Sequence, residues 1–156
     1  MPDFSGALRH HQRVVILVSR YHERVTTRLL DGARQCCREA GIPDDQVDVV
    51  WVPGAWELGT MAALMAGDGV SCIIALGAVI RGETPHFDFV AGETSRVLAD
   101  VAARQMIPVG FGLLTTETLD QALARAGGAA GNKGYEAAEA AIRTADLYAQ
   151  LLDDDA

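Results

Sequence analysis

The chain has 156 residues, of which 49% are hydrophobic, so it is long enough and apolar enough to form one globular domain with a substantial core. Its net charge of −8 argues against binding to nucleic acid or to an anionic membrane surface, although a small anionic substrate could bind where a few cations are placed locally. The sequence shows neither a signal-peptide pattern nor an apolar run long enough to span a membrane, so a cytoplasmic location is the default expectation.

The first half of the chain alternates between strand-like and helix-like patterns. The continuous apolar run VVILVS at 14–19 is typical of a strand that is covered on both faces. Apolar residues then recur at three- and four-residue spacing and predict a helix over 25–40. A second strand is predicted at 47–52 and a short helix at 56–66, and the run SCIIALGAVI predicts a third strand at 71–80.

The second half continues the same alternation. A helix is expected over 85–105 and a fourth strand over 107–114. Two further helices, at 117–126 and 133–152, are separated by the glycine-rich connection GGAAGN. Strands that alternate with helices imply a parallel sheet with helices on both of its faces.

Nothing in the sequence divides the chain into parts. Since neither a linker-like stretch nor an internal repeat is present, residues 1–156 are predicted to form a single domain. A flexible segment is expected at 1–12. The run DDD at 153–155 places negative charge at a helix C-terminus, where the helix dipole disfavours it, so the tail at 153–156 is expected to fray.

The three cysteines, Cys36, Cys37 and Cys72, have neither the spacing of a zinc site nor the even number of a disulfide framework. Cys36 and Cys37 fall within a predicted helix, which favours their interpretation as small buried hydrophobic residues. No metal site is predicted.

Chemically versatile residues follow each predicted strand at the point where it ends. The first strand leads into SRYH (19–22), the second into PGAWE (53–57), the third into RGETPH (81–86) and the fourth into TTET (115–118). In open parallel α/β sheets, ligands bind outside the carboxyl ends of the strands. The sequence therefore predicts a functional site at this rim of the sheet.

The segment after the third strand has the pattern of a helix start. Thr84 is the predicted N-cap and Pro85 the first helical residue. Backbone amides around Glu83 and Thr84 would then lie at the positive end of the helix dipole, which suits an anion. His86 would lie in the first turn, where the dipole favours a neutral imidazole that can accept a proton. A capped surface helix with an incidental histidine would explain the same residues.

The segment PGAWE combines groups that suit a flat ligand. Gly54 lets the backbone approach a ligand closely, Trp56 offers a stacking surface, and Glu57 can accept hydrogen bonds. The alternative is that Trp56 is a core anchor for the helix that it opens, and Tyr21 has the same two interpretations.

Two cations, Arg125 and Lys133, flank the glycine-rich connection. Arginine can hold a phosphate in bidentate geometry, and lysine adds a point charge. Exposed charges that are merely solvated are the alternative. The Gly-Lys-Ser/Thr order of a P-loop is absent, so no loop of that kind is predicted.

Taken together, five motifs resemble those of one enzyme family. VPGAWE, ALGAVIRGETPHFDFV, PVGFGLLTTET, QALARAG and GNKG occur in the order and spacing of the 6,7-dimethyl-8-ribityllumazine synthases, which catalyse the penultimate step of riboflavin biosynthesis. The resemblance covers residues 14–147, which is nearly the whole chain.

The resemblance implies a flavodoxin-like, three-layer α/β/α fold around a four-stranded parallel sheet. It implies a transferase that condenses 5-amino-6-(D-ribitylamino)uracil with 3,4-dihydroxy-2-butanone 4-phosphate to give the lumazine, phosphate and water, with no metal or organic cofactor. Family members form pentamers, pairs of pentamers or hollow sixty-subunit icosahedral shells, with active sites between neighbouring subunits. The compact GGAAGNKG connection resembles that of shell-forming members, and the product would pass to riboflavin synthase.

The resemblance also implies roles for individual residues. His86 matches the family's proton-transfer residue. The ring and the ribityl chain of the uracil substrate would contact Tyr21, Ala55, Trp56, Glu57, Ala78, Val79, Ile80 and Phe111. The phosphate of the butanone would contact Glu83 and Thr84 through backbone amides, together with Arg125 and Lys133.

Three positions depart from the family's pattern. Trp56 stands where phenylalanine is usual, and Tyr21-His22 replaces the more common Phe-Asn or Trp, so an aromatic surface is kept while the size of the pocket changes. Gly59 replaces the usual proline and is expected to loosen the turn into the following helix.

Two other functions fit parts of the sequence. An archaeal-type riboflavin synthase shares ancestry with this family, but GETPHFDFV and GNKG match the lumazine synthase pattern. A lumazine- or flavin-binding shell protein without catalysis is the second alternative. Such a protein would not need a proton carrier, so the presence of His86, Arg125 and Lys133 argues against it.

Overall fold

A computed structural model of the chain, in which residues 1–153 are described, contains a central four-stranded sheet. The strands are β1 (Arg13–Ser19), β2 (Val47–Val52), β3 (Val70–Ile80) and β4 (Val109–Thr116). They pair in the order β2-β1-β3-β4, and every pair is parallel.

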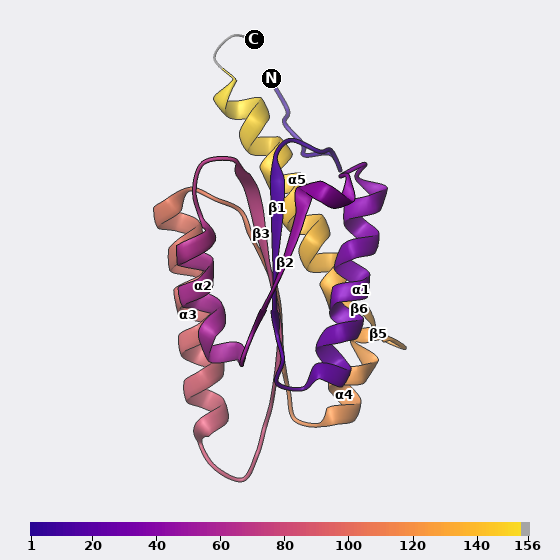
Figure 1. Cartoon of the computed structure of the whole chain (residues 1–156), viewed down its shortest axis with the longest axis vertical. Helices are drawn as coiled ribbons and strands as arrows, with labels where there is room; N and C mark the ends of the chain where they lie inside the picture. The colour runs from indigo at the N-terminus through magenta and orange to yellow at the C-terminus, as the bar shows by residue number, and fades with distance from the viewer. Residues whose placement is uncertain (154–156) are drawn as a thin grey trace.

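Helices cover both faces of the sheet. One face is covered by α2 (Leu58–Met65) and α3 (His86–Gln105), and the other by α1 (Glu23–Glu39), α4 (Leu119–Ala124) and α5 (Lys133–Leu152) (Figure 1). Single 3-10 turns at Asp44–Gln46 and Ala55–Glu57 precede and follow β2. The predicted flavodoxin-like, three-layer α/β/α sandwich with a four-stranded parallel sheet is confirmed.

The strands are buried on both faces, which explains why their sequences are unbroken apolar runs. Along β1, Val14, Ile16 and Val18 pack into the core beneath α1 and α5, while Val15 and Leu17 pack into the core beneath α2 and α3. All five side chains are at most 1% exposed. The sheet is therefore held from both sides, and the loops at its ends start from fixed positions.

The three cysteines are buried and unpaired, and the burial predicted for Cys36 and Cys37 is confirmed. Burial raises the pKa of Cys36 and Cys72 to about 12 and that of Cys37 to about 11. Thiols with such pKa values stay protonated at neutral pH, so they act as small hydrophobic side chains.

The fourth strand and the helix after it begin later than the sequence predicted. The fourth strand starts at Val109 and not at 107, because the N–H of Ile107 still donates to the carbonyl of Ala102 in the turn that ends α3, at 3.2 Å. The helix expected at 117–126 spans only Leu119–Ala124. It begins with a capping box in which the side chains of Thr118 and Gln121 bond to each other's backbone N–H groups.

The glycine-rich connection between α4 and α5 is folded, which the sequence did not predict. It forms a small antiparallel hairpin of β5 (Ala126–Gly128) and β6 (Gly131–Asn132). At one end of this hairpin the backbone N–H of Lys133 donates to the carbonyl of Arg125, at 2.8 Å. This bond places the backbones of Arg125 and Lys133, the two cations named in the sequence analysis, next to each other.

Gly59 lies in the first turn of α2 and is buried. A Cβ atom at this position would lie 2.6 Å from Cγ1 of Val97 on α3. Glycine therefore allows α2 to pack closely against α3. This close packing was not expected from the sequence, which predicted only that Gly59 would loosen the turn into the helix.

The residues that precede β1 run along α5. The N–H of Ala7 donates to the carboxylate of Asp146 at 2.8 Å, and the Nε2 atom of His11 lies 2.8 Å from the same carboxylate. The side-chain amide of Gln150 donates to the carbonyl of Ser5 at 2.9 Å. The flexibility expected for residues 1–12 stays a prediction, and residues 154–156 of the expected frayed tail lie outside the described residues.

Candidate active site

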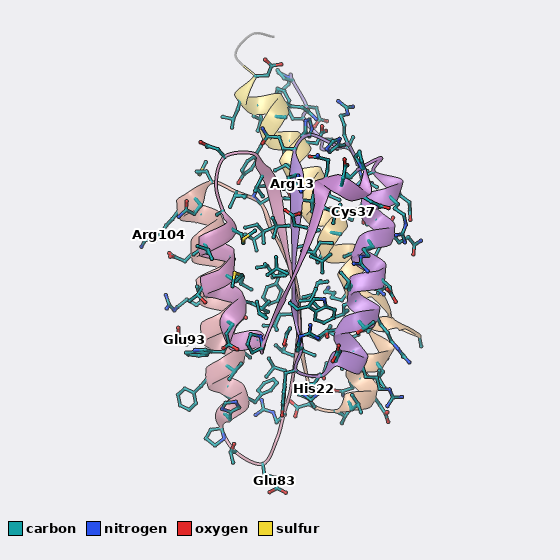
Figure 2. All side chains as sticks on the ribbon, viewed as in Figure 1. Arg13, His22, Cys37, Glu83, Glu93 and Arg104 are labelled. Carbon is teal, nitrogen blue, oxygen red and sulfur yellow. The ribbon has the colours of Figure 1, made fainter. Side chains whose placement is uncertain are left out.

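A cavity of about 900 Å³ opens where β1, β2 and β3 end, beside the start of α3, and we call it the rim cavity. Figure 2 shows His22 and Glu83 at this end of the sheet and Arg13 near the opposite end. The residues that line the rim cavity are Tyr21, His22, Gly54, Ala55, Trp56, Ala78, Val79, Ile80, Arg81, Gly82, Thr84, His86, Phe87, Phe89 and Val90.

Backbone hydrogen bonds join the loops that leave β1 and β2. The N–H of Arg20 donates to the carbonyl of Val52 at 2.8 Å, and the N–H of Tyr21 donates to that of Pro53 at 3.2 Å. These bonds bring Tyr21 to the segment that carries Trp56. Both rings are exposed, Tyr21 by 68% and Trp56 by 58%, so the interpretation of either residue as a core anchor is wrong.

The last residues of β3 form an apolar wall of the rim cavity. Ala78 and Val79 are 2% and 8% exposed, and Ile80 is half-buried. All three are paired with β4, Ile80 with Thr116 at the strand's end. The ladder of the sheet therefore fixes this wall, which suits a site that must hold a ligand in one orientation.

His86 is the first residue of α3 and is exposed to the rim cavity. The predicted N-cap at Thr84 is wrong, because the N-cap is Pro85, with φ −70° and ψ 4°. Proline has no side-chain acceptor, so no side chain caps this helix. The carbonyl of Pro85 accepts from the N–H of Asp88 at 3.0 Å, and the N–H of His86 adds a longer bond of 3.5 Å to the hydroxyl of Thr84. The helix start nevertheless faces the cavity, as predicted.

Arg81 also lines the rim cavity, although no role was predicted for it. Its guanidinium lies 3.0 Å from a carboxylate oxygen of Glu117 and 3.3 Å from one of Asp88, and it stacks 4.3 Å from the ring centre of Phe87. The hydrogen bond to Glu117 is the main reason why the pKa of Arg81 is raised. Its position directly after a buried strand was the signal that could have identified it.

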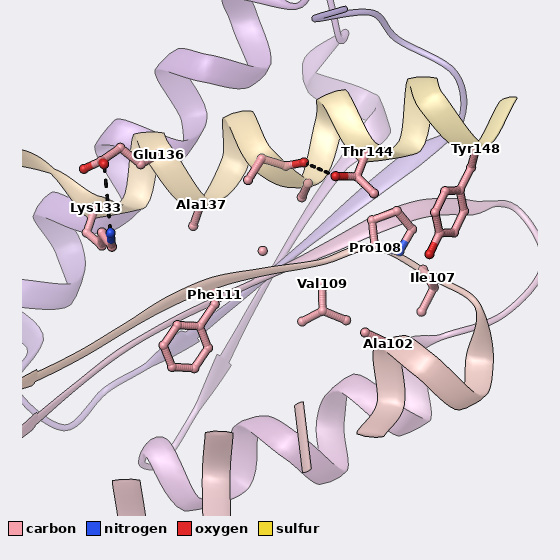
Figure 3. A pocket seen from close by; sticks show the side chains of 13 residues that line it. Ala102, Ile107, Pro108, Val109, Phe111, Lys133, Glu136, Ala137, Thr144 and Tyr148 are labelled. Carbon is pink, nitrogen blue, oxygen red and sulfur yellow. Dashed lines mark hydrogen bonds and ion pairs between the residues drawn. The ribbon is translucent and has the colours of Figure 1, made fainter. Parts of the chain in front are cut away.

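Five of the predicted residues lie outside the lining of the rim cavity, and three of them, Phe111, Arg125 and Lys133, come from β4 or from later in the chain. Phe111 and Lys133 line a separate groove of about 550 Å³ between β4 and α5, which we call the β4 groove (Figure 3). Lys133 forms an ion pair with Glu136 there, with 3.9 Å between the charged atoms. Arg125 is exposed just after α4, and its guanidinium donates to the carbonyl of Gln121 at 3.0 Å.

Glu57 and Glu83 also fall outside the lining of the rim cavity, although both are close to it in sequence. Glu57 is half-buried, directly after Trp56, and its carboxylate faces the backbone of Gly54. Glu83 is exposed in the loop between β3 and α3. The roles assigned to these residues stay predictions.

Two kinds of feature are absent from the part of the chain that the structure describes. Within residues 1–153, no three His, Cys, Asp or Glu side chains come together as a metal ion would require. None of the helices in this range combines the length and the apolar character of one that crosses a bilayer.

A family-wide sequence profile of the 6,7-dimethyl-8-ribityllumazine synthases matches residues 11–149. The chain belongs to this family. It is 47% identical over 154 residues to the 6,7-dimethyl-8-ribityllumazine synthase of Gemmatimonas aurantiaca, an alignment that covers 97% of this chain and 94% of that protein. The resemblance expected from the five motifs is confirmed, and the lumazine synthase fold agrees with the observed sandwich.

Proposed function

We propose that the rim cavity is where this chain carries out the reaction of its family. That reaction condenses 5-amino-6-(D-ribitylamino)uracil with 3,4-dihydroxy-2-butanone 4-phosphate and gives 6,7-dimethyl-8-ribityllumazine, phosphate and water. The observation that carries the proposal is the presence of two exposed aromatic rings, Tyr21 and Trp56, in the same cavity as His86 at a helix start.

The aromatic rings suit the uracil. Tyr21 and Trp56 present flat surfaces at the mouth of the cavity, and stacking on such surfaces contributes roughly 0.5–1.5 kcal/mol beyond the area buried. The wall formed by Ala78, Val79 and Ile80 offers backbone groups at the end of the strand. Ala55 and Glu57 would complete the binding of the uracil and its ribityl chain.

His86 would move the protons that the reaction requires. The 5-amino group of the uracil attacks the ketone, water leaves as the imine forms, phosphate departs, and ring closure expels a second water. A positioned acid or base contributes typically 10²–10⁴-fold to such steps. The ring of His86 is exposed and makes no side-chain hydrogen bond within residues 1–153, so it is available to the substrates.

The start of α3 would receive the phosphate. Its amino-terminal dipole favours an anion, and the backbone amides of Glu83 and Thr84, in the loop that precedes the helix, would donate to the phosphate. Arg125 would add fixed positive charge, which stabilises phosphate as it leaves. The reaction consists of addition, elimination and dehydration, so we expect no metal or organic cofactor.

Phe111, Arg125 and Lys133 would act in the rim cavity of a neighbouring subunit. They lie outside this chain's own cavity, Phe111 and Lys133 in the β4 groove and Arg125 beyond α4, as expected if each site is completed by a second copy. We propose a homo-oligomer built from pentamers, with a sixty-subunit shell as the preferred assembly. Light scattering that gave the mass of a single pentamer would reject the shell.

Three expectations remain about the setting of the reaction. We propose that residues 1–156 act as one lumazine synthase domain and that the product passes to riboflavin synthase. Three buried cysteines without a disulfide suit a reducing compartment, which supports the cytoplasmic location.

The decisive experiment mixes the protein with both substrates and follows the fluorescence of the lumazine. We expect turnover with the purified protein alone. Consumption of added lumazine with formation of riboflavin would instead indicate a riboflavin synthase. Tight binding of lumazine without turnover would indicate a binding shell protein.

A further inference from the structure

His22 has a backbone conformation that few residues adopt. Its φ of 62° and ψ of 47° place it in the left-handed region, where a side chain crowds the backbone and costs free energy. Among residues 1–153, only His22 and Met106 combine a positive φ with a side chain. Such strained residues cluster at ligand sites, because the rest of the structure must hold them in place.

The local structure gives no reason for a histidine here. His22 is the N-cap of α1, a position that favours Asn, Asp, Ser and Thr because their side chains accept a hydrogen bond from the first turn. The ring of His22 makes no such bond. Only its carbonyl serves the helix, accepting from the N–H groups of Val25 at 2.9 Å and Thr26 at 3.0 Å. Asparagine would tolerate this left-handed backbone better than histidine does.

The imidazole lines the rim cavity instead. Its ring centre lies 4.5 Å from that of Tyr21, with 65° between the two planes, so it stands edge-on beside the proposed stacking surface. Neither ring nitrogen is hydrogen-bonded to another group within residues 1–153. Partial burial lowers the pKa of His22, so the neutral ring, with one donor and one acceptor, prevails at pH 7.

We propose that His22 is a substrate-binding residue, which hydrogen-bonds to the ribitylaminouracil part of the ligand beside Tyr21 and is aimed into the rim cavity by its left-handed backbone. This inference rests on the proposed function. It adds a polar contact from the loop that follows β1, an element that supplies neither His86 nor the phosphate site.

The test measures binding of 6,7-dimethyl-8-ribityllumazine, the fluorescent product, by titration. His22→Gly keeps the left-handed backbone and removes the ring, so we expect the Kd to rise about tenfold while the Tm stays the same or increases. His22→Asn tolerates the same backbone and can donate and accept hydrogen bonds. It should recover most of the lost affinity. Inorganic phosphate should bind all three proteins equally well.

Met106→Gly is the matched control. Met106 is the other left-handed residue, it ends α3 at the opposite end of the helix from His86, and it is 68% exposed. Removing its side chain should change the Tm as His22→Gly does and leave the Kd for lumazine unchanged.

The possible outcomes separate the two proposals. If His22→Gly binds lumazine as tightly as the parent does, the proposed role of His22 is overturned. The role is also overturned if His22→Asn binds lumazine as weakly as His22→Gly does. If the parent itself binds no lumazine, the proposed function fails, and the role of His22 fails with it.

Discussion

The two ends of the central sheet treat their polar side chains in opposite ways. At the amino end, the buried carboxylate of Asp146 accepts hydrogen bonds from the N–H of Ala7 and the amide of Gln150, and His11 lies within hydrogen-bond distance. At the carboxyl end, the side chains of His22 and His86 have no hydrogen-bond partner within residues 1–153. The carboxylate of Asp146 is thus used in folding, whereas the rings of His22 and His86 are available to a ligand, although Arg81 at the same end is paired with Glu117 and Asp88.

The comparison predicts which histidine serves catalysis. His86→Ala should lower turnover about 10²–10⁴-fold and leave the Kd for lumazine within a factor of about three, because proton transfer is lost while the aromatic surfaces remain. His11→Ala is the matched control, and it should lower the Tm while turnover per folded protein is kept. Steady-state kinetics with both substrates would decide, and an unchanged rate for His86→Ala would show that it is not the proton carrier.

Asp146 should matter for folding and not for chemistry. Asp146→Ala leaves the N–H of Ala7 without its acceptor and removes one of the two acceptors of the Gln150 amide, which keeps the carbonyl of Ser5, so the free energy of unfolding should fall by about 2 kcal/mol. Denaturant unfolding measures this loss. Turnover per folded molecule should stay close to that of the parent. A large loss of turnover without a loss of stability would contradict the assignment of Asp146 to folding.

The environment of Asp146 also leads us to expect that the stability of the fold depends on pH in the acid range. The hydrogen bonds from Ala7 and then His11 lower the pKa of Asp146 to about 2, below the value of about 3.9 in an unfolded chain. The stabilisation is therefore complete above about pH 4 and is lost as the pH falls towards 2. Unfolding measured from pH 5 to pH 2 should show a shallower decline for Asp146→Asn than for the parent. Equal slopes would contradict this assignment.

Arg125 tests the phosphate end of the site. Arg125→Ala should weaken the binding of both inorganic phosphate and the butanone phosphate about tenfold, because a charge-assisted contact is lost. Arg104→Ala, at the far end of α3, is the control and should change neither. Loss of affinity for the uracil alone would argue against a phosphate role for Arg125.

The smallest expected effect concerns the packing of α2 against α3 at Gly59. Gly59→Ala places a Cβ against Val97, and this overpacking should lower the free energy of unfolding by about 1 kcal/mol. Val97→Ala in the same chain should recover part of the loss, a coupling that a double-mutant cycle measures. If the changes in the free energy of unfolding were additive, Gly59→Ala and Val97 would not be in steric conflict.

The four strands and the layers were predictable because each strand is buried on both faces and the flanking helices have an apolar stripe. The hairpin at GGAAGN was not, because Gly127 and Gly131 carry no apolar pattern, and their φ values of 94° and 87° are properties of the folded turn. Small strands of this kind are set by tertiary context.

The candidate site was only partly predictable. Strand ends placed Trp56 and His86 at one rim correctly, because carboxyl ends of parallel strands meet there. Phe111 lies in the middle of β4 and faces a different groove, which no motif along the chain reveals. The left-handed backbone of His22 was also hidden, because it opposes the local preference of that residue.

A crystal structure of the oligomer with bound 6,7-dimethyl-8-ribityllumazine would test the location of the site most directly. We expect the heterocycle to stack on Trp56 and Tyr21 within about 4 Å, with His86 in the same cavity. A neighbouring subunit should supply Phe111. Lumazine bound at the amino end of the sheet, with the rim cavity empty, would contradict the assignment of the rim as the site of condensation.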